Sequence, residues 1–228
     1  MPVNPQHPPG TALVGCAGWN VPHEVGAFFP PEGSHLERYA AVWGAVEINS
    51  SFYRPHRPAT YARWAASVPP AFRFEVKTPR TITHHARLVD VEQPLAQFAS
   101  EANALGDKLG CVLVQLPPSL AFDTDVATRF FAYLKAAFTC MLACEARHPS
   151  WFSAEASQLL EAWGVTRVWA DPPAGQTGAF APTTNASYLR LHGSPPDVLL
   201  RICRRLLGRA TRGIGPTRCG QPPCMGDF

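Results

Sequence analysis

The stretch from residue 110 to residue 146, GCVLVQLPPSLAFDTDVATRFFAYLKAAFTCMLACEA, decides the fold class. Its first apolar run, Gly110–Leu116, predicts a buried strand that stops at two prolines. The amphipathic segment Asp123–Phe138 then predicts a helix, and the apolar run Met141–Ala146 predicts a second strand. A strand, a helix and a strand in this order predict two parallel strands joined by a right-handed crossover.

The same alternation of short apolar runs and helical patterns extends over most of the 228 residues. Strands are expected at Thr11–Ala17, Ala45–Phe52, Phe72–Lys77, Gly110–Leu116, Met141–Ala146, Val165–Ala170 and Ser187–Leu191. Helices are expected at Ser34–Trp43, Tyr61–Val68, Pro94–Leu105, Asp123–Phe138 and Ser153–Trp163. Strands of this kind suit either a closed TIM-type (β/α) barrel or an open doubly wound sheet.

The first strand-to-helix turn separates these two α/β architectures. A doubly wound sheet usually carries a glycine-rich phosphate loop at this point. The turn Gly15–Pro22 has two glycines but not a third, and the bulky Trp19 follows at once. The sequence therefore favours the TIM-type barrel.

Composition limits the class of protein. No apolar run reaches the ~20 residues of a transmembrane helix, so no membrane partner is expected. The formal charge of +3 neither requires nor excludes nucleic acid. The segment Met1–Gly10 is rich in proline and has no apolar core of a signal peptide, so we expect it to be disordered. The seven cysteines are an odd number, which predicts reduced thiols and a cytoplasmic location.

Polar and charged side chains gather where the predicted strands end. Alternate residues of a strand share a face, so Glu47 lies with Asn49, Glu145 with Arg147, and Arg190 with His192. A barrel strand is covered on both faces, which makes charge costly there unless it is paired. Charges at the carboxyl ends of several strands are typical of the catalytic rim of a barrel.

Two roles are assigned to these side chains. The candidates for general acid–base catalysis are Glu47, Glu145, Asp171 and His192. The candidates for ligand binding are Trp19, Asn49, Tyr53, Lys77, Arg147, His148 and Arg190. Within this second set, the lysine and the two arginines can clamp a phosphate or a carboxylate. The alternative for each single residue is a structural network in which opposite charges neutralise one another.

A metal centre is the main rival to this anion site. The carboxylates of Glu47, Glu145 and Asp171 are available as ligands for a divalent ion. Histidines at strand ends are few, however, and the neighbouring cationic side chains would repel a metal ion. We therefore expect no metal and no cofactor.

Six motifs, in the same order, resemble those of the YecE-like family, which is catalogued as a domain of unknown function. The motifs are Gly15–Trp19, Glu47–Tyr53, Phe74–Lys77, Gln115–Ser119, Glu145–Trp151 and Tyr188–Gly193. The resemblance covers a domain of residues 11–195 and implies a TIM-type barrel. It implies no activity, because the family has no settled reaction and a barrel fold alone does not supply one.

The sequence departs from this family after about Pro195. Family members continue toward a last strand resembling Trp-Cys-Ile-Phe-Asp-Asn-Thr, whereas residues 196–228 form an aberrant arginine-rich tail. Our hypothesis is a shift of reading frame near Pro195 or Pro196; the alternative is a basic tail for nucleic acid. The first interpretation predicts a truncated barrel that lacks its last strand and has two unpaired strand edges.

Three functions remain open from the sequence. The first is an enzyme, or a former enzyme, that binds an anionic or phosphorylated small molecule at the rim. The second is a nucleic-acid-binding or nuclease-like barrel, which ranks lower because no continuous basic stripe precedes residue 195. The third is a non-catalytic binding module or an inactive truncated product.

Overall fold

A computed structural model describes residues 12–21, 23–176 and 178–192. Seven strands form one sheet in which every neighbouring pair is parallel and the spatial order follows the order in the chain. The strands are β1 (Gly15–Ala17), β2 (Ala45–Ile48), β3 (Arg73–Lys77), β4 (Leu109–Gln115), β5 (Met141–Glu145), β6 (Val165–Asp171) and β7 (Tyr188–Leu191). This sequential order is that of a barrel, because a doubly wound sheet reverses direction at a switch point.

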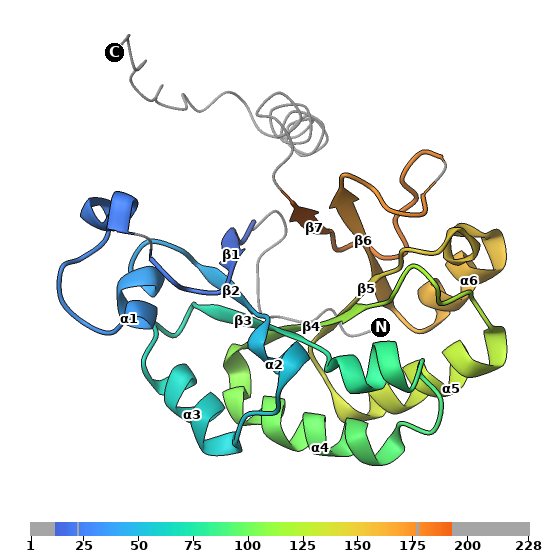
Figure 1. Ribbon diagram of the computed structural model, residues 1–228, viewed down its shortest axis with the longest axis horizontal. Coiled ribbons are helices and arrows are strands. Elements are labelled where there is room, and N and C mark those ends of the chain that lie inside the picture. The colour runs from blue at the N-terminus through green and yellow to red at the C-terminus, as the bar shows by residue number, and fades with distance from the viewer. Residues whose placement is uncertain (1–11, 22, 177, 193–228) are drawn as a thin grey trace, which may run out of the picture. The chain divides into compact units, whose positions relative to one another are not determined.

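Helices connect the strands and cover one side of the curled sheet. They are α1 (His35–Ala40), α2 (Ser50–Tyr53), α3 (Pro58–Ala66), α4 (Glu92–Ala102), α5 (Thr124–Ala137) and α6 (Ala154–Ala162). Short helical turns also occur at His23–Phe28, Thr81–His85, Asn103–Lys108 and Pro149–Phe152. Figure 1 shows α3, α4 and α5 along the outer side of the strands, and no described helix on the inner side.

Local sequence signals explain where these helices begin. Ser34 and Glu37 form the predicted capping box of α1, and Asp123 caps α5 by accepting a hydrogen bond from the Val126 amide at 2.9 Å. Helix α3 begins three residues before the predicted start because Pro58 occupies its first position, which suits proline. These caps hold the helices in place behind the strands.

The second predicted strand is shorter than expected. The pattern predicted a strand over Ala45–Phe52, whereas β2 ends at Ile48 and α2 follows directly. The reason is local, because the Ser51 hydroxyl contacts the carbonyl oxygens of Ile48 at 2.9 Å and Lys77 at 2.7 Å. These contacts hold the chain in a helical turn beside the end of β3.

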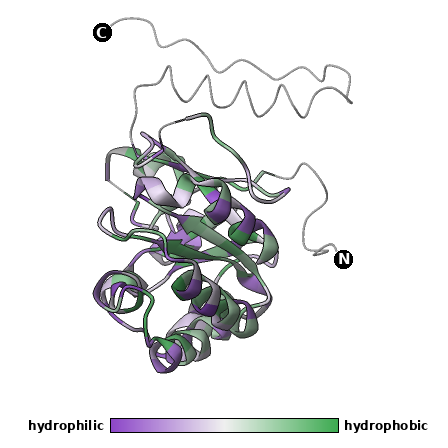
Figure 2. Cartoon of the chain, turned by 90° about the vertical axis from the view of Figure 1, so that its right-hand side faces the viewer, coloured by the Kyte–Doolittle hydropathy of each residue, from purple (hydrophilic) through white to green (hydrophobic). Residues whose placement is uncertain are grey.

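The core has two parts because central strands such as β2, β4 and β5 bury both faces. The outer face packs against the helices through side chains such as Val46, Phe74 and Phe131. The inner face carries a smaller apolar cluster of Cys111, Leu113, Ala143, Val168 and Tyr188. Figure 2 shows the strands as mainly apolar and the helices as two-faced. The polar site lies on the inner face, beyond the apolar cluster.

The described strands form a parallel half-barrel. Among them, β1 pairs only with β2 and β7 pairs only with β6, so these two strands are the edges of the sheet. The predicted disordered segment 1–10 and the tail 196–228 lie outside the described residues. An eighth strand would also have to come from outside them.

Candidate functional site

The site is built at the carboxyl ends of β2, β3, β5 and β7. Glu47 on β2 is level with Glu75 on β3, and Lys77 follows two residues later on the same face. Glu145 ends β5, and Arg190 on β7 is level with Ala170 of β6. The parallel strands therefore bring these side chains to one end of the inner face.

Arg190 links two buried carboxylates from different strands. Its Nε and Nη2 donate to the two oxygens of Glu47, both at 2.9 Å, and its Nη1 donates to Glu145. Glu47 and Glu145 are 6% and 2% exposed. Burial by itself would lower the pKa of Arg190, but the two carboxylates outweigh this effect and raise it. Arg190 is therefore always positively charged and forms ion pairs with both carboxylates.

Arg147 joins the same network from its more exposed side. Its Nε and Nη2 both donate to Oε1 of Glu145, at 2.9 and 2.7 Å. The side chain is 29% exposed, and its Nη1 makes no hydrogen bond with the described residues. One edge of this guanidinium is thus available to a ligand.

Glu75 and Tyr188 extend the network toward the apolar cluster, and neither was chosen from the sequence as a site residue. The Tyr188 hydroxyl lies 3.0 Å from Oε2 of Glu47 and 2.5 Å from Oε2 of Glu75. Burial raises the pKa of Glu75, and the negative charge of Glu47 adds to this effect. One hydroxyl proton cannot serve both acceptors fully, and the hydrogen bond that Tyr188 donates to Glu75 partly offsets the effect of burial on the pKa of Glu75.

Lys77 is a cationic side chain that forms no ion pair with the carboxylates of Glu47 and Glu145. Its side chain is buried at 8% exposure, and its Nζ lies 4.2 Å from the centre of the Phe52 ring. It forms no ion pair or side-chain hydrogen bond with the described residues, because the two arginines occupy the oxygens of Glu47 and Glu145. Burial lowers the pKa of Lys77, and the positive charge of Arg190 lowers it further.

A hollow of about 380 Å³ lies beside this network, at the ends of β1 and β2. Its walls include Trp19, Glu47 and Asn49, so the structure brings these three sequence-predicted residues together. Ser50 also lines it, and Ser50 Oγ is 2.7 Å from Nε2 of His56. This contact was missed because six residues of separation across a turn give no periodic signal.

Four other predicted site residues stand apart from the ion network. Asp171 has the opposite orientation on its strand, because Ala170 is level with Arg190; its Oδ2 is buried and makes no hydrogen bond with the described residues. His192 is exposed and contacts Asp171 only through the main chain, at 2.9 Å. Their roles in acid–base chemistry stay predictions.

Tyr53 and His148 have local contacts instead. Tyr53 is 66% exposed, and Arg80 lies over its ring at 5.8 Å. His148 Nδ1 accepts a hydrogen bond from the Ser150 amide at 3.2 Å and so caps the turn Pro149–Phe152. A ligand-binding role for either residue also stays a prediction.

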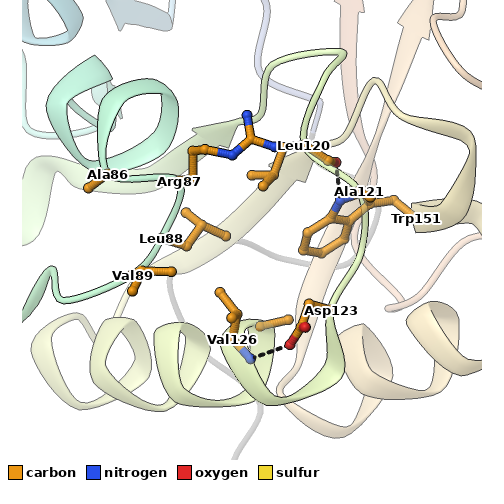
Figure 3. A pocket seen from close by; sticks show the side chains of 10 residues that line it. Ala86, Arg87, Leu88, Val89, Leu120, Ala121, Asp123, Val126 and Trp151 are labelled. Atoms are coloured by element: carbon orange, nitrogen blue, oxygen red, sulfur yellow. Dashed lines mark hydrogen bonds between the residues drawn. The ribbon is translucent and has the colours of Figure 1, made fainter.

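A second cavity, of about 240 Å³, lies among the helices and contains none of the network residues. Its walls are Ala86, Arg87, Leu88, Val89, Leu120, Ala121, Asp123, Val126, Ala127 and Trp151. Figure 3 shows that its polar contacts are already used: Trp151 donates to the Leu120 carbonyl at 3.0 Å, and Asp123 caps α5. This cavity therefore has apolar walls and few polar groups that a ligand could contact.

Within the described ranges, no group of three or more histidine, cysteine, aspartate or glutamate side chains is placed to hold a metal ion. No described helix is long and apolar enough to cross a membrane.

A half-barrel of sequentially ordered parallel strands, with helices outside and charged side chains at the strand ends, defines a TIM-like α/β protein. Comparison with known proteins gives the family. A family model described as protein of unknown function DUF72 matches residues 13–212, and the chain belongs to this family.

Curated relatives agree with this assignment. The chain is 30% identical to the UPF0759 protein YecE of Escherichia coli K12 over 142 residues, which cover 60% of this chain and 52% of the relative. It is 27% identical to the UPF0759 protein YunF of Bacillus subtilis over 79% of this chain and 69% of the relative. The chain thus spans about half the length of YecE and about two thirds of YunF.

Solved structures show the same fold. A DUF72 family protein from Thermotoga maritima matches with a TM-score of 0.70 at 24% identity, over 88% of both chains. One from Enterococcus faecalis matches with a TM-score of 0.67 at 17% identity, over 86% of this chain and 84% of that chain.

Proposed function

We propose that this protein binds a small anionic ligand, through a carboxylate or a phosphate, at the carboxyl ends of β2, β3, β5 and β7. The observation that carries the proposal is the buried amine of Lys77, which has no carboxylate partner among the described residues. A buried ammonium without a counter-charge is costly, so an incoming anion would be its missing partner.

The arrangement around Lys77 supports an anion and not a cation. Glu47 and Glu145 are already bound by guanidinium groups, so they offer no free carboxylate to a metal ion. The unoccupied edge of Arg147 can supply a second positive contact to the same ligand. The hollow on the β1 and β2 side of Glu47 borders the same network, although Lys77 and Arg147 do not line it.

The same end of the sheet also has groups that can move protons. Burial raises the pKa of Glu75, and its contact with Tyr188 connects it to Glu47. Two carboxyl groups joined by one hydroxyl form a short path for a proton. This proton path supports the more specific proposal that the bound anion undergoes acid–base chemistry.

Thermal unfolding of the chain with and without inorganic phosphate or pyruvate tests anion binding. We expect both anions to raise the melting temperature, because a ligand that binds only the native state stabilises it. K77M should lose this increase. Without ligand, K77M should be more stable than the wild type by ~1–2 kcal/mol, because an unpaired buried cation is replaced by an apolar side chain.

The matched control is K135M, since Lys135 is exposed on α5. This variant should keep the full response to both anions. The proposal fails if neither anion shifts the wild-type melting temperature, or if K77M responds as strongly as the wild type.

A further inference from the structure

The three lysines of this chain have different surroundings. The sequence has 20 lysine and arginine residues together, and only Lys77, Lys108 and Lys135 are lysines. Lys108 donates to the carbonyl oxygens of Ala65 and Val68, both at 2.5 Å, and Lys135 is exposed. Lys77 alone combines burial with an amine that has no acceptor among the described residues.

Arginine would serve a purely electrostatic role at this position at least as well. A guanidinium stays charged, binds carboxylates and phosphates with two hydrogen bonds, and stacks on aromatic rings such as Phe52. A lysine amine differs because it can lose its proton and then attack an electrophile. The side chain at position 77 therefore has a reactivity that the surrounding arginines lack.

The neighbours of Lys77 favour this reactive form. Burial and the positive charges of Arg190 and Arg147 lower the pKa of the Lys77 amine; the negative charges of Glu47 and Glu145 oppose this effect, but neither carboxylate forms an ion pair with the amine. Burial lowers the pKa of His84, and the positive charge of Lys77 lowers it further. The His84 ring packs edge-on against Phe52, with ring centres 5.0 Å apart, and Lys77 Nζ lies over the same Phe52 ring.

We propose that Lys77 is a nucleophile that forms an imine with a 2-oxo acid bound at these strand ends. The inference rests on the anion site proposed above and names the chemical class of its ligand. In a 2-oxo acid the carbonyl carbon is bonded directly to the carboxylate. A carboxylate drawn to Arg147 would thus bring the carbonyl carbon to the amine of Lys77.

The chemistry balances without an oxidant or a cofactor. The unprotonated amine attacks the carbonyl carbon and forms a carbon–nitrogen bond, and a proton passes from nitrogen to the carbonyl oxygen. The resulting carbinolamine loses its hydroxyl group and the remaining amine proton as water, which leaves a carbon–nitrogen double bond. Protonation of this nitrogen restores a positive charge beside the carboxylate of the ligand.

Reductive trapping tests the proposal on the full chain. The protein is incubated with pyruvate and sodium borohydride, digested, and analysed by mass spectrometry. Hydride from the borohydride adds to the imine carbon, so the trapped product carries the mass of pyruvate less one oxygen atom. We expect this increase on the peptide that contains Lys77 and not on those with Lys108 or Lys135.

K77R is the decisive variant, because it keeps the positive charge and removes the amine. It should lose the adduct yet retain a higher melting temperature with phosphate, which also reports that it is folded. K135R should keep both the adduct and the response to phosphate. Equal labelling of all three lysines, or an adduct that persists unchanged in K77R, would overturn the inference.

The test separates the two proposals. Lactate has the carboxylate of pyruvate but no carbonyl, so it should stabilise the wild type without forming an adduct. If pyruvate and lactate both stabilise the protein and no adduct forms, the imine is wrong and the anion site stands. If neither compound stabilises the protein and no adduct forms, both proposals fail.

Discussion

Arg190 and Lys77 show how two cations in the same surroundings can have opposite roles. Arg190 reaches both Glu47 and Glu145 because its planar group carries donors on three nitrogens. Lys77 lies on the same face of the sheet, but both carboxylates already form ion pairs with arginines. The guanidinium therefore maintains the structure of the site, and the amine is left for a ligand.

R190M should strongly destabilise the protein. The substitution leaves the carboxylates of Glu47 and Glu145 buried without their main partner, and loss of one member of a buried pair costs ~3–5 kcal/mol. Urea unfolding should show this loss, whereas R129M, at an exposed position on α5, should stay within ~0.5 kcal/mol of the wild type. A loss in R190M no larger than that in R129M would mean that the network is not formed.

Glu75 should make stability depend on pH. Burial raises its pKa in the native state, so the native protein binds more protons than the unfolded chain between the ordinary carboxyl pKa and the raised one. This contribution is complete below the ordinary value and is lost as the pH rises through the native pKa. E75Q should flatten that decline in urea titrations at several pH values, and E92Q, on the exposed side of α4, should not. An E75Q profile parallel to the wild-type profile would contradict this assignment.

At the scale of elements, the two edge strands are the exposed parts of the sheet. Among the described strands, β1 and β7 each have one neighbour. Val14 next to β1 is 58% exposed and Leu191 of β7 is 43% exposed. Parallel edges with apolar side chains can pair with other chains. We propose that these two described edges pair between copies of the chain.

If these strand edges pair, the chain should self-associate. Sedimentation velocity should show larger species as the protein concentration rises. V14K together with L191K should reduce them, because lysine on an edge opposes strand pairing. Y133K, at an exposed position on α5, should have no such effect. A wild type that remains a monomer with a cooperative melt at all concentrations would contradict the proposal.

At the scale of the whole molecule, periodicity predicted the parallel sheet, because each apolar run and each amphipathic segment is a local signal, and the first strand-to-helix turn favoured the barrel. The pairing of charges is not local. Glu47 and Arg190 are 143 positions apart, and nothing in their own segments indicates which carboxylate an arginine will bind. The role of Tyr188 was missed for the same reason, since its partners lie on β2 and β3.

The position of Asp171 shows a second limit. It follows an apolar run as the other candidates do, but its strand continues one residue further than predicted and turns its side chain away from the face that carries Arg190. A difference of one residue reverses the face, because side chains alternate along a strand. The type of residue at a strand end therefore predicts the face that its side chain takes less well than its position in the strand register does.

A crystal structure of the protein grown with pyruvate is the most direct test of the account. We expect density for the carboxylate within hydrogen-bonding distance of Lys77 Nζ, with the free edge of Arg147 in contact with the same group. Saturating pyruvate with no density between these two side chains, or density only in the cavity lined by Arg87 and Trp151, would contradict it.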